Sequence, residues 1–568
     1  MSSEVLREKV LEVINTVESH GLFVHDELLT VRCEGEHGNE MWSMPLVVTL
    51  AVLNALVPRG AMLLYGGHGG GKTTLAKVLG RMMTGAHLSE IEEAVVRGHP
   101  QLTEEKMIAT LKPGRLLRDG VEEVVWRKFV TSFWKIVDEI NRLTPYTQNI
   151  LLSLLAEGRV KFYDAVYECG SFVLYATMNP QDPGTFEIGL PLLDRFGIAV
   201  PITMPSVTEI PFILSGQDER LYGYDPYYQV PQVLSVEELR SIWRLVDATP
   251  VDEEAKLFVG NLISEFSACE RASKENVTLL RTDSGLCDGC HFNVEKSVCN
   301  KVVTPLSVRA AKDILRYSKA LSWLLGAEKV TVDMVVAIAP YAVWHRVKYP
   351  ERLLMEPPYY GDQLKFTFDV MKLVMERFVA RRKALEIFEK FKMGEGGEGA
   401  LKNLEEWGRS DLVVKTELVP KARHFATREY RSVMEKIRKA LRVDNVRELE
   451  KVRNVILSER GLPNRFEILR KLEEAIHEKT KKIYMVPFRE WGAVYGKLAV
   501  KFPELQEPLK QTFKPPVSKC IKHRELTIIV HATGGSDEDP VFVEIAGGKA
   551  DEVAKIVEEV CGSDKKEE

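Results

Sequence analysis

The glycine-rich stretch that begins at Gly66 constrains this chain more than any other feature. An apolar run over residues 61–65 predicts a buried strand before it, and residues 74–83 have the periodicity of a helix after it. The spacing Gly-x4-Gly-Lys-Thr, which ends at Thr73, is that of a P-loop, whose glycines let main-chain N–H groups approach phosphates. The alternative is a glycine turn without a ligand. Strand, turn, Lys-Thr and helix follow one another in the required order, which favours the P-loop.

Nucleoside triphosphate binding is the chemistry expected of this stretch. Lys72 would contact the β- and γ-phosphates, Thr73 would ligate Mg²⁺, and the helix N-terminus would add a favourable dipole. The residues expected to bind ATP are Gly66, Gly67, His68, Gly69, Gly70, Gly71, Lys72, Thr73 and Thr74.

A second apolar run, residues 133–137, leads directly into Asp138 and Glu139. In an ATPase site, Asp138 would hold Mg²⁺ through water and Glu139 would polarise the attacking water. An Asp-Glu pair after a strand commonly marks only a solvated strand end. Its position downstream of a P-loop favours the catalytic interpretation.

Two further candidates follow along the chain. Residues 160–166 and 169–175 predict a hairpin, whose second strand continues to Asn179. An asparagine at the end of a parallel strand beside the P-loop strand can orient the nucleophilic water, and a simple Asn-Pro turn is the alternative. Arg195 ends a short predicted helix. It is either a surface ion-pair partner or, in an oligomeric ATPase, a finger that reaches a neighbour's γ-phosphate.

Composition restricts the class of protein. A chain of 568 residues exceeds one core and predicts roughly three to four domains. With 45% hydrophobic and 28% charged residues it resembles soluble globular proteins, and a net charge of −5 gives no general reason to expect nucleic acid. The longest apolar run, residues 44–57, is too short to span a bilayer. Eight cysteines and no signal peptide indicate a reducing, cytoplasmic location.

Four short motifs resemble the MoxR branch of the AAA+ ATPases: DEINR from Asp138, EGRV from Glu157, ATMNP from Ala176 and LDRF from Leu193. Residues 233–246 and 306–310 resemble the lid of that family and its second sensor, which would be Arg309. The resemblance covers about residues 44–347. It implies an α/β P-loop AAA+ core with a parallel sheet and a helical lid.

The same resemblance implies a function. ATP would be hydrolysed at subunit interfaces of a homo-oligomer, a hexameric ring, with Asn179 sensing the γ-phosphate. Arg195, acting in trans, and Arg309 would stabilise the developing charge. MoxR-type proteins resemble chaperones that remodel or mature protein complexes, often with a partner that carries a von Willebrand factor A domain.

Two other functions stay open. The hairpin before Asn179 is shared with replicative helicases, so a nucleic-acid translocase is one alternative, and a metal-chelatase motor subunit is the other. Residues 420–482 carry 18 Lys and Arg against 10 Asp and Glu, but few aromatic residues lie among them. Because single-stranded nucleic acid is bound by basic grooves with stacking aromatics, nucleic acid is the less favoured partner.

Half of the cysteines cluster within 31 residues: Cys269, Cys287, Cys290 and Cys299. A Cys-x2-Cys pair with a further cysteine on each side has the spacing of a tetrahedral thiolate site, so we expect a structural Zn²⁺. An iron–sulfur cluster and four unliganded thiols are the alternatives, and His291 could replace one thiolate.

The sequence predicts six segments. They are an N-terminal segment, the α/β core, the lid with its cysteine insertion at 269–299, a long helix with a glycine-rich linker, a helical accessory region and a small α+β region. Their bounds are 1–43, 44–205, 206–350, 351–400, 401–520 and 521–568. No chemistry is recognisable after residue 350.

Overall fold

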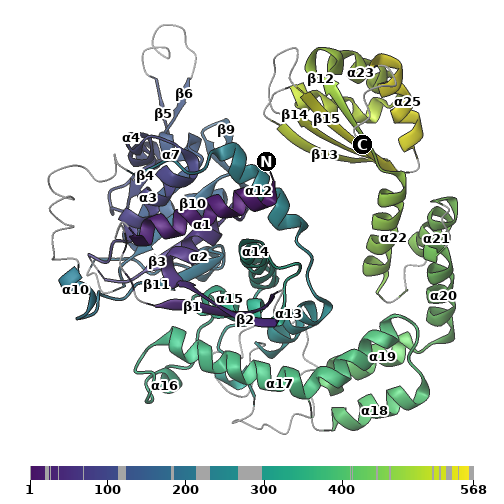
Figure 1. Cartoon of the computed structure of the whole chain (residues 1–568), viewed down its shortest axis with the longest axis horizontal. Helices are drawn as coiled ribbons and strands as arrows, with labels where there is room; N and C mark the ends of the chain where they lie inside the picture. The colour runs from purple at the N-terminus through teal and green to yellow at the C-terminus, as the bar shows by residue number, and fades with distance from the viewer. Residues whose placement is uncertain are drawn as a thin grey trace. The chain divides into compact units, whose positions relative to one another are not determined.

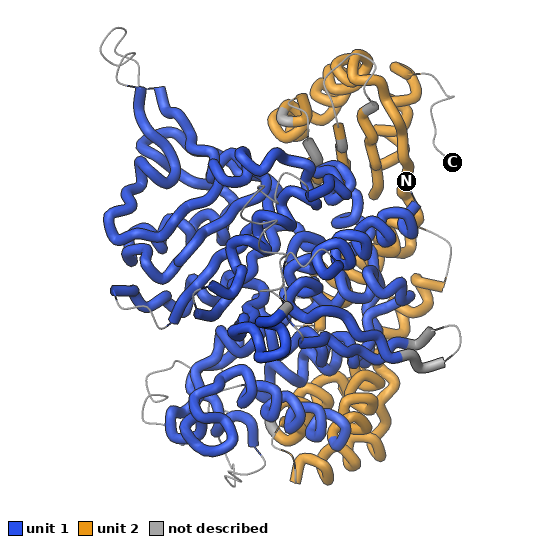
Figure 2. The backbone as a smooth tube through the Cα atoms, turned by 60° about the vertical axis from the view of Figure 1, so that its left-hand side comes forward, with its two compact units in different colours: residues 1–380 blue, residues 381–568 orange. Residues whose placement is uncertain are grey.

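The computed structural model describes most of the chain in two compact units, residues 1–380 and 381–568 (Figure 2). The finer division into six segments stays a prediction. The residues described are 2–19, 23, 25, 27–35, 38–67, 69–112, 123–180, 184–212, 230–266, 297–409, 411, 413–442, 446–458, 462, 464–513, 517–523, 526–532, 540–547 and 549–561.

A five-stranded parallel sheet forms the centre of the first unit (Figure 1). The strands in spatial order are β11 (Ile198–Pro201), β3 (Ala61–Tyr65), β10 (Val173–Met178), β7 (Trp134–Asp138) and β4 (Val95–Arg97). Their residues are almost continuously apolar and buried, as parallel strands covered on both faces require. The predicted α/β fold is confirmed.

Helices α2 (Leu46–Ala55) and α3 (Lys72–Thr84) pack against this sheet. All ten residues of α2 are buried, which explains its lack of a polar face. The remaining helices and turns of the α/β core are α1 (Ser3–Ser19), α4 (Leu88–Glu93), α5 (Glu104–Met107), α7 (Lys128–Thr131), the 3-10 turn Ile140–Arg142, α8 (Pro145–Glu157), α9 (Leu190–Leu193) and α10 (Glu209–Phe212).

The predicted hairpin was wrong in its pairing. Strand β8 (Arg159–Phe162) pairs with β9 (Ala165–Glu168), and β10 leaves the hairpin to lie between β3 and β7. The burial patterns give the reason: β8 and β9 alternate between more and less buried positions, whereas five of the six residues of β10 are buried. Two other hairpins are β1 (Leu28–Gly35) with β2 (Gly38–Pro45), and β5 (Ala109–Leu111) with β6 (Val124–Trp126).

A helical lid follows the core within the same unit. Its described elements are α12 (Val236–Ala248), α13 (Glu253–Glu265), the 3-10 turn Cys299–Lys301, α14 (Val308–Leu325), α15 (Val332–Val343) and α16 (Glu351–Leu354). The Trp243 indole N–H donates to the Ala55 carbonyl over 2.8 Å and ties α12 to α2. Helix α17 (Gln363–Lys392) contacts the lid near its middle, where Arg377 pairs with buried Glu265 of α13 at 2.8 Å.

The second unit has its own core. Four antiparallel strands, in the order β12 (Lys482–Pro487), β15 (Pro540–Gly547), β14 (Leu526–Ala532) and β13 (Val517–His523), pack against α23 (Phe488–Lys501) and α25 (Ala550–Cys561). The helices and turns before and between are α18 (Glu398–Gly408), the π-turn Val414–Leu418, α19 (Val419–Phe425), α20 (Arg428–Arg442), α21 (Val446–Ser458), α22 (Arg465–Thr480), the 3-10 turns Pro503–Leu505 and Gln511–Phe513, and α24 (Gln506–Lys510).

Candidate functional site

A pocket lies at the carboxyl ends of β3, β7 and β10, where parallel sheets commonly hold ligands. It collects six of the nine residues predicted to bind ATP, the predicted Mg²⁺ ligand Asp138 and both predicted water-orienting residues, together with Thr177, which was not predicted. The lining residues are Gly69, Gly70, Gly71, Lys72, Thr73, Thr74, Asp138, Glu139, Thr177 and Asn179. Gly66 and Gly67 form the first turn of the same loop, and His68 lies outside the described residues.

The glycine loop adopts a backbone that larger residues disfavour. Gly69 and Gly71 have φ values of +77° and +71°, and Gly71 is the N-cap of α3. The Lys72 ammonium donates to the carbonyl of Gly66 over 3.0 Å and to that of Gly67. The Lys72 ammonium therefore contacts the first residues of the loop, and a phosphate chain bound by the loop would lie close to its positive charge.

Partial burial lowers the pKa of Lys72, and the nearby carboxylates of Asp138 and Glu139 oppose that shift. The carboxylates thus favour the protonated ammonium. A positive charge at this position is what a phosphate ligand requires.

Asp138 is the centre of a compact set of oxygen atoms. Its Oδ1 accepts hydrogen bonds from the hydroxyls of Thr73 and Thr177, each over 2.6 Å. Carboxylate and hydroxyl oxygens are the ligands that Mg²⁺ takes in nucleotide sites. Thr73 and Asp138 therefore fit a magnesium site, and Thr177 fixes the orientation of the carboxylate.

Glu139 adopts an unusual conformation for a residue with a side chain, with φ of +53°. Its main-chain N–H donates to the Thr177 hydroxyl over 2.9 Å, and its carboxylate pairs with Arg142 at 3.3 Å. The Thr177 hydroxyl thus contacts both acidic residues: it donates to the Asp138 carboxylate and accepts from the Glu139 main-chain N–H.

Asn179 is buried at the end of β10, next to the P-loop strand. Its main-chain carbonyl accepts from the Asn141 amide over 2.7 Å, which connects β10 to the turn after Glu139. The predicted placement of Asn179 at the pocket agrees with the pocket lining.

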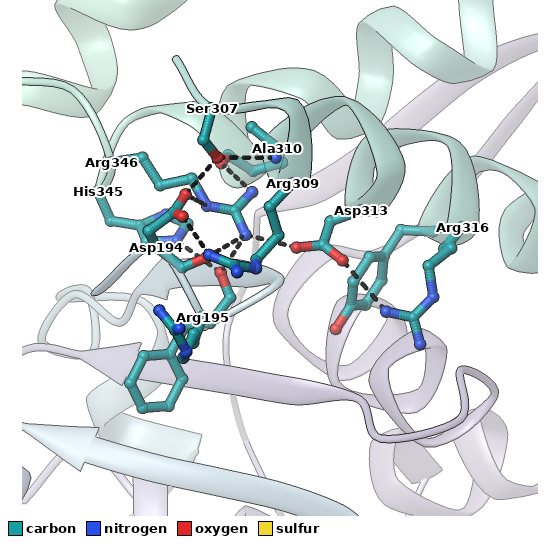
Figure 3. A network of polar contacts seen from close by, with 12 residues as sticks. Asp194, Arg195, Ser307, Arg309, Ala310, Asp313, Arg316, His345 and Arg346 are labelled. Atoms are coloured by element: carbon teal, nitrogen blue, oxygen red, sulfur yellow. Dashed lines mark hydrogen bonds and ion pairs between the residues drawn. The ribbon is translucent and has the colours of Figure 1, made fainter. Parts of the chain in front are cut away.

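The two predicted arginines are brought together at a different place (Figure 3). Arg309, in the first turn of α14, pairs with Asp194 at 2.5 Å, and the guanidinium of the adjacent Arg195 donates to the Pro191 carbonyl over 2.7 Å. Neither arginine is among the pocket-lining residues. Burial and then Arg309 lower the pKa of Arg195, and Asp194 opposes this.

Sequence reasoning missed several residues of this arrangement. Thr177 lies in the ATMNP motif, and its position two residues before Asn179, on the same face of the strand, was the available signal. Asp194 also lay in a quoted motif, but nothing in the sequence linked it to Arg346, 152 residues away.

The cysteine cluster falls largely on undescribed residues: Cys269, Cys287 and Cys290 lie outside the described part, as does His291. Cys299 begins a 3-10 turn before α14. Among the described residues, no group of three His, Cys, Asp or Glu side chains could hold a metal ion. In that same part of the chain, no helix combines the length and apolarity needed to cross a bilayer.

Comparisons with known proteins agree with this geometry. The family model described as AAA domain (dynein-related subfamily) matches residues 61–196, and that described as AAA lid domain matches residues 299–359. The chain is 23% identical to Protein MoxR of Paracoccus denitrificans, over 53% of this chain and 83% of that one.

Two further relatives show a similar extent of likeness. Protein MoxR of Methylorubrum extorquens is 23% identical over 57% of this chain and 87% of its own length. The uncharacterized protein YeaC of Bacillus subtilis is 25% identical over 40% of this chain and 68% of its own length.

Proposed function

We propose that this chain, a MoxR-type AAA+ ATPase, hydrolyses MgATP at the interfaces of a homo-oligomeric ring to remodel or mature protein complexes. The observation that carries the proposal is the pocket in which Lys72, Thr73, Asp138, Glu139 and Asn179 meet.

Each residue has a role in the proposed reaction. Lys72 binds the β- and γ-phosphates by charge-assisted hydrogen bonds. Glu139 accepts the proton of the attacking water, and Asn179 orients that water toward the γ-phosphate. Arg195 of a neighbouring subunit and Arg309 donate to the oxygens on which negative charge develops.

Thr73 and Asp138 would hold Mg²⁺ in this site. When bound, the metal supplies charge neutralisation for the phosphate oxygens. The contact of Thr177 with Asp138 keeps the carboxylate directed at the P-loop, since the threonine hydroxyl and the Thr73 hydroxyl both reach the same oxygen.

Replacement of Glu139 by glutamine tests the assignment directly. Glu139→Gln keeps the size of the side chain and the contacts of Asp138, but removes the group that accepts the proton. We expect ATP to bind as in the wild type and hydrolysis to fall at least ~100-fold, the scale of a lost acid–base group. Glu253→Gln, at an exposed carboxylate of α13, is the control and should hydrolyse normally. Wild-type turnover by Glu139→Gln would refute the role of Glu139.

The resemblance to MoxR-type proteins supports the rest of the proposal. We propose a hexameric ring in the cytoplasm, a protein client, and a partner with a von Willebrand factor A domain. Capture of clients by the ATP-trapped Glu139→Gln variant, with the nucleotide-free protein as the control, would identify the partner. If the variant captures the same proteins with and without ATP, or captures none, the proposal that a client is held in the ATP-bound state is contradicted.

A structural Zn²⁺ held by Cys269, Cys287, Cys290 and Cys299 is also proposed, from the spacing of the four cysteines alone. Elemental analysis of protein purified without oxygen should find zinc near one atom per chain. Iron with a visible absorption band would indicate an iron–sulfur cluster instead. Protein that retains neither metal would remove both forms of the proposal.

A further inference from the structure

One buried arginine, Arg346, lies at the end of the lid and faces the segment that carries Arg195 (Figure 3). Its side chain is 2% exposed. It follows α15 closely, and its Nη1 donates to the Ala342 carbonyl of that helix over 3.0 Å. Burial of a guanidinium is costly unless its donors are paired. Both Nη atoms of Arg346 have hydrogen-bond partners and Nε has none among the described residues, so the Nη partners indicate what the side chain holds in place.

The first group of partners is the main chain on either side of Arg195. The Nη2 of Arg346 donates to the carbonyl of Phe196 over 2.8 Å and to that of Asp194 over 3.2 Å. The carbonyls of the residues before and after Arg195 are therefore both bound by one side chain of the lid. The Arg195 side chain lies outside this cluster, as Figure 3 shows.

The second group of partners is a pair of carboxylates. Arg346 Nε lies 3.5 Å from Oδ1 of Asp194, and Nη2 donates to Asp313 over 2.5 Å. The Asp194 carboxylate in turn accepts from the Ser307 hydroxyl over 2.7 Å and from Arg309 over 2.5 Å. Asp194 thus links the side chain of Arg309 to Arg346.

We infer that Arg346 is a positioning residue for hydrolysis: it fixes the main chain of Arg195 and, through Asp194, the side chain of Arg309. This inference rests on the proposed function, in which both arginines stabilise the developing charge. The planar guanidinium of Arg346, with five donors, reaches three carbonyls and two carboxylates at once, whereas the ammonium of lysine has three donors on a single atom. Charge alone would therefore not replace Arg346.

The variant Arg346→Lys tests this role because it keeps the positive charge beside Asp194 and Asp313. We expect kcat to fall about 10- to 100-fold, the scale of a displaced catalytic group, with KM for ATP within about twofold of wild type because the P-loop is untouched. Combination with Arg195→Ala should cost less than the product of the two single losses, since both changes affect the contribution of Arg195.

Arg381→Lys is the matched control. Arg381 is another buried arginine, paired with Asp411 through Nε at 2.8 Å, but it lies in the second compact unit. It should lose comparable thermal stability yet keep wild-type kcat. A fall of kcat in Arg381→Lys as large as in Arg346→Lys would show a general stability effect and overturn the positioning role.

Asp194→Asn provides a second route if Arg346→Lys does not fold. The amide keeps the shape of the side chain but weakens its contacts with Arg309 and Arg346, so kcat should fall while KM for ATP stays unchanged. If the kcat losses of Arg346→Lys and Arg195→Ala multiply in the double variant, or if only KM changes, the inference is overturned while the ATPase proposal stands. A wild-type protein without ATP hydrolysis overturns the proposed function itself.

Discussion

The conformation of Glu139 depends on a glycine that carries no chemistry of its own. The Gly98 N–H donates to the Asp138 carbonyl over 2.7 Å. A Cβ added at Gly98 would lie 2.0 Å from the Glu139 carbonyl oxygen, far inside van der Waals contact. There is therefore no room for a methyl group at Gly98 beside the main chain of the acidic pair. Glu139 itself is already in the left-handed region of φ.

Gly98→Ala should therefore displace Glu139 without altering any side chain of the site. We expect hydrolysis to fall at least ~10-fold, because small displacements of reacting groups are costly. Unfolding free energy should fall by about 1–3 kcal/mol from the added contact. Steady-state kinetics and urea unfolding would measure the two quantities.

The control for Gly98→Ala is Gly492→Ala. Gly492 is an exposed residue inside α23, and a Cβ there would meet nothing within 4 Å. Alanine should raise the free energy of unfolding by about 1 kcal/mol, the difference in helix propensity, and leave hydrolysis unchanged. Unchanged hydrolysis in both variants would show that the main chain at Glu139 tolerates displacement.

At the scale of elements, strand β7 contains a buried cation three residues before Asp138. Lys135 has no exposed surface, and its ammonium donates to the carbonyls of Phe129, Val130 and Ser132 over 2.6–2.7 Å. These carbonyls include the end of α7, so the lysine fixes α7 to the strand. Burial lowers the pKa of Lys135 from 10.5 to about 8.

The lowered pKa of Lys135 predicts a pH dependence of stability with a definite sign. Between pH 8 and pH 10.5 the unfolded chain binds more protons at this lysine than the folded chain does, so its contribution to stability rises with pH. The complete gain in the free energy of unfolding would be about 3 kcal/mol. It is reached above pH 10.5, and none of it is present below pH 8. Urea unfolding of wild type and Lys135→Met at pH 7 and pH 10 should show a smaller gain with pH in the variant.

Lys161→Met, at an exposed lysine of β8, is the control and should keep the wild-type pH dependence. Equal pH dependence in wild type and Lys135→Met would mean that the three carbonyls hold the ammonium charged over this whole range.

Local pattern predicted some elements and not others. Residues 61–83 predict the strand, the glycine turn and the start of α3, so the P-loop side of the pocket could be located from the sequence. The pairing of β10 was predicted only in part. Its place beside the P-loop strand is confirmed, but its pairing with residues 160–166 was wrong, because an apolar run does not specify which strands lie next to it. The Asp194–Arg346 contact was hidden for the same reason, since periodicity carries no information about tertiary distance.

At the scale of the whole molecule, the proposed function predicts that each site is divided between two copies of the chain. Arg195→Ala should bind ATP but fail to hydrolyse it, and Lys72→Ala should not bind ATP. Mixing the two variants should restore activity above that of either alone, because some interfaces then combine an intact P-loop with an intact Arg195. Arg195→Ala mixed with Glu139→Gln after separate purification should behave likewise.

The control is each variant mixed with itself at the same total concentration. Absence of rescue at every mixing ratio, despite subunit exchange seen by a labelled chain, would show that Arg195 acts within its own subunit or not at all.

Helix α17 runs unbroken from Gln363 to Lys392, and the border between the two compact units, after residue 380, falls inside it. Borders between domains usually fall in exposed linkers. A recombination breakpoint at this border would cut through helical hydrogen bonds and leave about four carbonyls on one fragment and four N–H groups on the other without partners. It would also separate buried Phe378 from buried Arg381. We therefore expect the two units to be inherited together, because recombination at the border after residue 380 would disrupt α17.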